Sequence, residues 1–263
     1  MNQRNAVAFF ARGNSWSSKS DRDRAIADYN EAIRLNLGNA DVFFARGNSW
    51  SGKGDHDRAI ADYSDAIRLN PQFAYAFYSR GIAWELKGDN DKAIADYNEG
   101  IRLNPQYASA YVVRGNAWRN KGDNDKAIAD YNEAIRLNPQ FARAFLNRGV
   151  AWGRKGDNDR AIADYDEAIR LNPHYALAFT NRGNAWTLKG EHNRAIADHD
   201  EAIRLNPQEA VAFFARGLSW EQKNELALAL RDFKSFVRLN PNDPNGIKEV
   251  QRIEMKIDAR NRK

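Results

Sequence analysis

The chain has 263 residues, and its 40 basic and 35 acidic side chains give a formal net charge of +5. It contains no cysteine, which excludes disulfides, thiolate metal sites and a cysteine nucleophile, and which fits a reducing compartment such as the cytoplasm. The longest apolar runs are short, so we expect no segment that spans a membrane. Charges of both signs are spread along the whole chain, so the small positive excess is weak evidence for binding to nucleic acid.

All tryptophans of the chain stand 34 residues apart: Trp16, Trp50, Trp84, Trp118, Trp152, Trp186 and Trp220. A fixed period of this length indicates one supersecondary unit copied in tandem, with each copy packed on its neighbours. Counted from the alanine six residues before each Arg-Gly pair, the repeats are residues 6–39, 40–73, 74–107, 108–141, 142–175, 176–209 and 210–243. We therefore expect a single solenoid over residues 1–263.

The third repeat, residues 74–107, illustrates the expected local structure. Phe77, Gly81 and Trp84 follow one another at spacings of four and three residues, which place them on one face of a helix. Between the two halves of the repeat lies Gly88, which suits the left-handed conformation that ends a helix, followed by an aspartate that can cap the next one. Pro105 ends the second helix, because the residue before proline is pushed out of the helical region. Each repeat is therefore predicted to be a helical hairpin.

This pattern resembles the tetratricopeptide repeat family. Small residues at positions 8, 20 and 27, aromatic residues at positions 4, 11 and 24, and proline at position 32 match the family over residues 6–243. The exceptions are Leu37 at position 32, His199 at position 24 and Phe236 at position 27. The resemblance implies an all-α fold, an α-α superhelix in which antiparallel helix pairs form a right-handed solenoid with a concave groove. It also implies that the glycine at position 8, which costs about 1 kcal/mol relative to alanine in a helix, lets the two helices approach closely opposite the small residue at position 20.

Two charged positions are constant in all seven repeats: position 7 is arginine and position 23 is aspartate. A row of arginines beside a packing face needs acidic partners. We therefore expect a ladder of arginine–aspartate pairs with a structural role. The sequence leaves open whether each pair lies within one hairpin or joins consecutive hairpins.

The two ends of the array differ from its middle. Ser20 and Asn224 replace the turn glycine in the first and last repeats, and Asp243-Pro244 is a suitable helix start after the last one. An apolar stripe follows on one face of this segment: Ile247, Val250, Ile253 and Ile257. We expect a capping helix over residues 244–260. No such segment precedes Ala6, so the flank of the first helix is predicted to be open, and a second copy of the chain is one candidate occupant.

Positions that vary between the repeats are the candidates for recognising a partner. Positions 2, 5, 9 and 12 of the first helix point away from the packing face, and the resemblance implies that they line the concave groove. Position 5 is mostly apolar, and an exposed row of aromatic side chains is typical of a contact site, although the resemblance also implies that position 5 packs partly against its neighbours. Position 9 is often asparagine, which can bind the backbone of an extended peptide or merely fill a solvated groove. The candidate groove residues, which include position 6 asparagines and arginines of the fourth and fifth repeats, are Phe10, Asn14, Phe44, Asn48, Tyr78, Val112, Asn116, Arg119, Arg143, Leu146, Asn147, Arg154, Asn181, Asn184 and Phe214.

The sequence predicts no catalytic residue, cofactor or metal site. It has no glycine pattern for binding phosphates or dinucleotides and no metal-ligand spacing. We therefore expect a scaffold that is not an enzyme, takes no small-molecule substrate and binds a protein or peptide in its groove. Nucleic acid is not expected as a partner, because the groove is largely apolar at position 5. Two alternatives stay open: a module that forms homo-oligomers through its N-terminal flank, and the recognition arm of a larger enzyme.

Overall fold

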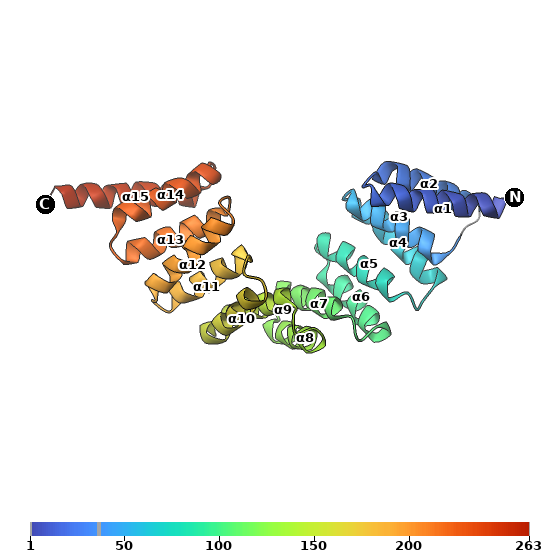
Figure 1. The fold of residues 1–263 in the computed structure, drawn as a ribbon, viewed down its shortest axis with the longest axis horizontal. Coiled ribbons are helices and arrows are strands. Elements are labelled where there is room, and N and C mark those ends of the chain that lie inside the picture. The colour runs from blue at the N-terminus through green and yellow to red at the C-terminus, as the bar shows by residue number, and fades with distance from the viewer. Residues whose placement is uncertain (1, 36–37, 263) are drawn as a thin grey trace. The chain divides into compact units, whose positions relative to one another are not determined.

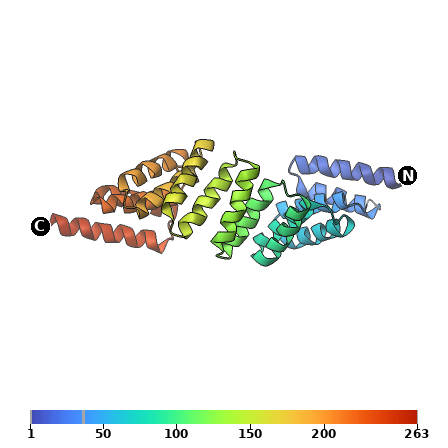
Figure 2. The ribbon, with the colours of Figure 1, turned by 90° about the horizontal axis from the view of Figure 1, so that it is seen from below.

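The computed structural model describes residues 2–35 and 38–262. All regular structure in these two ranges is α-helical. The chain divides into two compact units, Met1–Asn138 and Pro139–Lys263, and within each unit consecutive helices pack side by side (Figures 1 and 2). The predicted fold class, an all-α stack of antiparallel helix pairs, is therefore confirmed.

The first unit consists of four helical hairpins. Its helices are α1 (Asn2–Ser18), α2 (Arg22–Arg34), α3 (Ala40–Gly52), α4 (His56–Leu69), α5 (Ala74–Leu86), α6 (Asn90–Leu103), α7 (Ala108–Asn120) and α8 (Asn124–Leu137). Each hairpin corresponds to one predicted repeat, although α1 begins at Asn2, ahead of the predicted repeat start at Ala6.

The second unit consists of three hairpins and one further helix. Its helices are α9 (Ala142–Arg154), α10 (Asn158–Leu171), α11 (Ala176–Leu188), α12 (His192–Leu205), α13 (Ala210–Gln222), α14 (Leu226–Leu239) and α15 (Pro244–Asn261). The last of these is the capping helix that the sequence predicts over residues 244–260.

A residue with positive φ joins the two helices of every hairpin. Ser20 and Asn224 adopt this conformation in the first and last hairpins, with φ of 61° and 60°. Glycines with φ between 77° and 87° do so in the others: Gly54, Gly88, Gly122, Gly156 and Gly190. An aspartate N-cap follows in five hairpins, and its side chain accepts a backbone hydrogen bond from the first turn of the next helix. The hairpin turns are therefore those that the sequence predicts.

The glycine at position 8 lies against an aromatic ring. A Cβ atom added to Gly13 would stand 2.6 Å from Cε1 of Tyr29, the residue at position 24. The ring at position 24 fills the same place in the other repeats, with His199 and Phe233 in the last two. The alanine at position 20 is fully buried in all seven repeats. The helices do approach closely, and the ring at position 24 is the nearest group that leaves no room for a side chain on the glycine.

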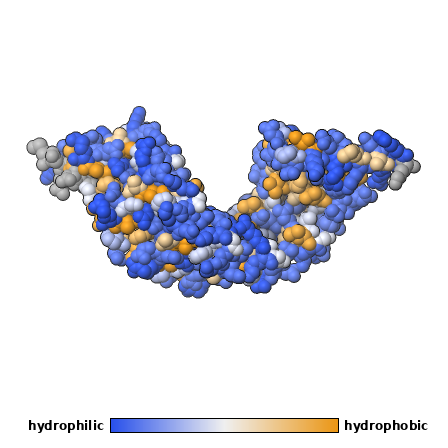
Figure 3. Space-filling view, turned by 180° about the vertical axis from the view of Figure 1, so that it is seen from behind, coloured by the Kyte–Doolittle hydropathy of each residue, from blue (hydrophilic) through white to orange (hydrophobic). Residues whose placement is uncertain are grey.

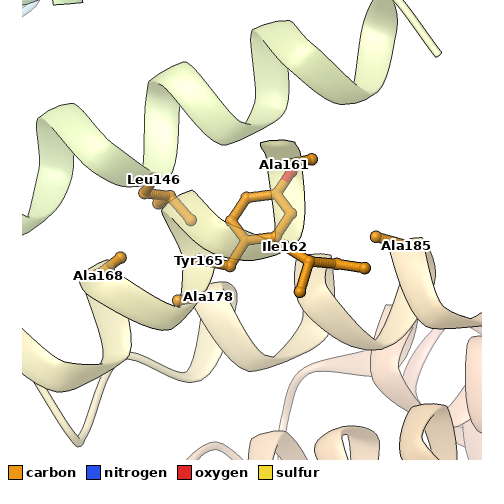
Figure 4. Close-up of a cluster of buried hydrophobic side chains, with 7 residues drawn as sticks. All are labelled: Leu146, Ala161, Ile162, Tyr165, Ala168, Ala178 and Ala185. Carbon is orange, nitrogen blue, oxygen red and sulfur yellow. The ribbon is translucent and has the colours of Figure 1, made fainter. Parts of the chain in front are cut away.

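Small alanines and one large ring make up the core of a hairpin, as the second unit illustrates (Figure 4). Tyr165 of α10 packs with Leu146 of α9 and Ala178 of α11, and all three are buried. Trp152 and Trp186 border this cluster and are half-buried. The alanines bring the helices close enough for a single ring to fill the remaining space at the density of a protein interior.

The arginine at position 7 and the aspartate at position 23 form a bidentate ion pair in every repeat. In the third repeat, Nε and Nη2 of Arg80 donate to Asp96 at 2.8 and 2.7 Å, and Nη1 donates to Ser64 of the preceding hairpin at 2.9 Å. The seven pairs are Arg12–Asp28, Arg46–Asp62, Arg80–Asp96, Arg114–Asp130, Arg148–Asp164, Arg182–Asp198 and Arg216–Asp232. The predicted ladder is therefore confirmed, each pair lies within one hairpin, and the third donor of Arg80 joins that hairpin to its neighbour.

The tryptophans lie at the edge of the hairpins, where cationic side chains cover them. Trp84 lies beside Lys92, whose Nζ is 4.3 Å from the ring centroid, and Trp152 lies beside Arg160, whose Cζ is 3.8 Å from the ring centroid. All seven rings are half-buried. Their constancy therefore reflects packing combined with cation–π contacts.

The capping helix α15 covers the apolar end of the last hairpin. Ile253 is fully buried against Ala229 and Phe233, and Val250 and Ile257 pack at the border of this cluster. The fourth residue of the predicted stripe, Ile247, is 40% exposed and lies outside the cluster.

An ion-pair network also holds α15. Glu221 of α13 accepts hydrogen bonds from Arg252 at 2.5 Å and from Lys256 at 2.6 Å. These contacts, led by the hydrogen bonds from Arg252, lower the pKa of Glu221 to about 2. The carboxylate of Glu221 is therefore engaged in attaching the cap.

Candidate functional site

A hollow of about 570 Å³ lies between α1 and α3 in the first unit. The residues that line it are Phe10, Asn14, Ser17 and Ser18 of α1, Tyr29 of α2, and Asp41, Phe44, Ala45 and Asn48 of α3. Most of them occupy positions 2, 5, 9 and 12, the face that the sequence predicts for the groove. Four of the candidate residues, Phe10, Asn14, Phe44 and Asn48, are thus brought together in one site.

The two asparagines of the hollow are held by buried tyrosines. The hydroxyl of Tyr29 donates to Oδ1 of Asn14 at 2.8 Å, and the hydroxyl of Tyr63 donates to Oδ1 of Asn48 at 2.9 Å. Burial raises the pKa of Tyr63 to about 12, so its hydroxyl keeps its proton at neutral pH. Since each side-chain oxygen is engaged, the amide NH2 group is the end that remains for a ligand. Each asparagine is therefore fixed in one orientation and presents two donors.

The aromatic side chains of the hollow are partly packed into the hairpins. The ring centroids of Phe10 and Tyr29 are 5.9 Å apart, and those of Phe44 and Phe73 are 4.8 Å apart. Phe10 and Phe44 are both half-buried. These rings therefore contribute to the core and expose a part of their surface to the hollow.

The remaining candidates of the first unit lie on α5 and α7, outside the hollow. Tyr78 is half-buried, with its ring centroid 5.1 Å from that of Tyr107. Val112 is only 2% exposed, so its assignment to the groove is wrong: a short branched side chain at position 5 ends within the helix packing, whereas a phenylalanine extends beyond it. Asn116 accepts a hydrogen bond from the hydroxyl of Tyr131 at 2.8 Å. Arg119 is half-buried near the end of α7.

Two candidates of the second unit are buried. Leu146 is 3% exposed because it belongs to the cluster around Tyr165, and Asn147 is 9% exposed because position 6 is turned from position 5 toward the packed side of the helix. Their assignment to the groove surface is therefore wrong. Phe214 is half-buried and contacts Phe233, with 5.4 Å between the ring centroids, so it mainly serves the cluster beneath the capping helix.

The polar candidates of the second unit do not gather at one point. Arg143 is the second residue of α9 and Arg154 is the last, so about 16 Å of helix separates their backbones. Both are exposed. Asn181 and Asn184 lie on α11 and are half-buried.

The hollow also contains residues that were not among the candidates. Asp41 and Ser17 stand at positions 2 and 12, which the helical period had already assigned to this face, so both could have been found from the sequence. Tyr29 stands on the second helix of its hairpin, and the pattern of the first helices carries no signal for it. The site therefore combines aromatic rings, oriented amides, hydroxyls and one carboxylate.

Outside the hollow, the surface is mainly polar and the described residues form no metal site. On the face drawn in Figure 3, apolar patches interrupt a mainly hydrophilic surface. Over residues 2–35 and 38–262, no group of three or more histidine, cysteine, aspartate or glutamate side chains is placed to hold a metal ion. None of the helices described above is both long enough and apolar enough to cross a membrane.

Family models match most of the repeats. Models described as TPR repeat or tetratricopeptide repeat match residues 44–108, 115–156, 142–175 and 189–244. The chain belongs to the tetratricopeptide repeat family. Membership in this family, together with its fold, supports a role as a protein-interaction scaffold. No curated protein matches the sequence.

Solved structures of other tetratricopeptide repeat proteins are similar to this chain. MamA is 29% identical, with a TM-score of 0.59, over 62% of this chain and 96% of MamA. A tetratricopeptide repeat protein from Parabacteroides merdae is 19% identical, with a TM-score of 0.75, over 95% of this chain and 99% of that protein. YrrB, described as having an unusual peptide-binding site, is 23% identical, with a TM-score of 0.58, over 72% of this chain and 97% of YrrB. The last two likenesses concern the fold alone.

Proposed function

We propose that this tetratricopeptide repeat protein is a non-catalytic scaffold that binds an extended peptide segment of a partner protein in the hollow between α1 and α3. The observation that carries the proposal is the pair of oriented asparagines. Asn14 and Asn48 stand on neighbouring parallel helices, and each presents an amide NH2 group while a buried tyrosine holds its oxygen. Such donors suit the backbone carbonyls of an extended chain.

The rest of the hollow supports the same ligand class. Phe10 and Phe44 offer ring surface to an apolar part of a peptide, and Ser17 and Ser18 add hydroxyls at the other end. A volume of about 570 Å³ lies within the range of sites that bind small ligands or short segments. The peptide-binding site named in the description of YrrB agrees with this proposal by analogy of fold.

Selection from a random peptide library tests the proposal. Twelve-residue peptides displayed on phage are selected for binding to the full chain. The affinity of a selected peptide that carries a fluorescent label is then measured by fluorescence anisotropy. The double variant Asn14→Ala, Asn48→Ala is expected to weaken binding about tenfold or more, since each lost hydrogen-bonding group contributes about 1 kcal/mol.

Asn116→Ala is the matched control. It removes the same kind of tyrosine–asparagine hydrogen bond at a place outside the hollow, and it is expected to leave the affinity unchanged. Circular dichroism checks that all variants are folded. Equal affinity of the double variant and the wild type would refute the site, and equal weakening by Asn116→Ala would assign the effect to stability.

Self-assembly through the N-terminal flank is a second candidate, which a specific observation favours. Asn5, Ala8, Phe9 and Arg12 line a hollow of about 320 Å³ on α1. The Nη1 atom of Arg46 donates to Asn30 of the preceding hairpin, whereas Nη1 of Arg12 has no partner among the described residues. Light scattering over a range of concentrations tests this: a dimer that Ala8→Glu abolishes supports it, and a monomer at high concentration refutes it.

A further inference from the structure

The hollow between α1 and α3 contains a single charged side chain, Asp41. It is exposed in the first turn of α3 and makes no hydrogen bond or ion pair with any described residue. Other aspartates of the first unit have basic partners: Asp57 pairs with Lys87, and Asp65 with Arg68. Because no basic side chain among the described residues pairs with Asp41, its carboxylate gives the hollow a negative charge.

The groups beside Asp41 follow a definite order along α3. Phe44 stands about one turn after Asp41, and Asn48 about one turn after Phe44, so carboxylate, ring and amide succeed one another over about 10 Å. Phe10 of α1 adds a second ring to the lining. A basic residue in an extended peptide offers the complementary order: a cationic group, an aliphatic stem that packs on rings, and a backbone carbonyl.

We propose that the hollow selects peptides with a lysine or arginine whose cationic group binds at Asp41 and whose stem lies on Phe44 and Phe10. This inference rests on the proposed function and names the chemistry of its ligand. An acidic side chain at the same place would meet the carboxylate of Asp41 without a compensating base. A purely apolar side chain would bury that carboxylate without a partner.

The peptides selected on the full chain provide the test. A selected peptide is resynthesised with norleucine in place of lysine, or citrulline in place of arginine. The basic and the neutral peptide are then each titrated into the wild type and into Asp41→Asn. The substitution Asp65→Asn, which removes one negative charge outside the hollow, is the matched control. We expect a basic residue at a fixed place in the selected peptides. The neutral peptide should bind the wild type about tenfold more weakly than the basic peptide does, and the two peptides should bind Asp41→Asn with equal affinity.

The outcomes separate this inference from the proposed function. If binding depends on Asn14 and Asn48 but the neutral replacement leaves the affinity unchanged, the inference is overturned and the proposed peptide site is supported. If the neutral replacement weakened binding to the wild type and to Asp41→Asn by the same factor, the inference would also be overturned, because the cationic group would then bind elsewhere. Peptides indifferent to both asparagines would overturn the inference and the proposed function together.

Discussion

The buried histidine of the sixth repeat offers a direct test of how the hairpins are packed. His199 of α12 is fully buried at position 24, and neither of its ring nitrogens has a hydrogen-bond partner among the described residues. In the first, second and fourth repeats the residue at this position is tyrosine, which donates to an asparagine 15 residues earlier. Asn184 stands at that separation from His199. The substitution His199→Tyr is therefore expected to recreate this hydrogen bond.

The size of the effect follows from the contacts. Leaving a buried polar group unpaired costs about 1–3 kcal/mol, and a new hydrogen bond contributes about 1 kcal/mol. The larger ring should fit, because a Cβ added to Gly183 would stand 2.6 Å from the ring of His199, as close as one added to Gly13 would stand to the ring of Tyr29. We expect His199→Tyr to raise the free energy of unfolding by about 2 kcal/mol.

Urea unfolding followed by circular dichroism measures this change. In an Asn184→Ala background the gain is expected to shrink by about 1 kcal/mol, because the new hydroxyl loses its acceptor. The reverse substitution Tyr131→His in the fourth repeat is expected to destabilise the chain by a similar amount. A variant His199→Tyr that is no more stable than the wild type would refute the reasoning, and a gain unaffected by Asn184→Ala would refute the proposed partner.

Three further predictions concern stability. Burial lowers the pKa of His199 to about 4 from 6.5. Between these pH values the unfolded state therefore binds more protons than the folded state, so the free energy of unfolding falls as the pH drops from 6.5 to 4, by about 3 kcal/mol at most. The substitution His199→Tyr should flatten this part of a stability–pH profile, and an unchanged slope would contradict the prediction. Ser20→Gly should relieve a left-handed serine and raise stability by about 1 kcal/mol, measured by urea unfolding, with Gly54→Ala lowering it. Arg80→Ala leaves Asp96 buried without its partner and should cost about 3–5 kcal/mol; a loss below about 1 kcal/mol in the same assay would speak against a stabilising ladder.

The hairpins could be predicted from the sequence because their signals are local and repeated. Gly88 has the left-handed φ that its place before an aspartate indicates, and the constant arginine and aspartate form the expected pairs. The bond from Arg80 to Ser64 of the preceding hairpin could not be predicted, because it depends on how two hairpins stack. In addition, position 25 is asparagine, serine or aspartate in the first six repeats and lysine in the last.

The candidate site was harder to predict, because side chains at one position of the repeat have different environments. Phe10 and Val112 both stand at position 5, yet the first lines a hollow and the second is buried. The hydrogen bond from Tyr29 to Asn14 joins two helices of one hairpin, so a pattern drawn from the first helix alone does not contain it. Glu221 stands at position 12, which the helical period assigns to the groove face, but its carboxylate binds Arg252 of α15.

The central claim is that a peptide binds at the amide groups of the hollow, and nuclear magnetic resonance observes these groups directly. A selected peptide is titrated into the ¹⁵N-labelled full chain, and the side-chain NH2 resonances of the asparagines are followed. The account predicts that the signals of Asn14 and Asn48 shift until saturation while that of Asn245, which lies on α15, stays in place. Saturable binding that leaves the signals of Asn14 and Asn48 unmoved would contradict it.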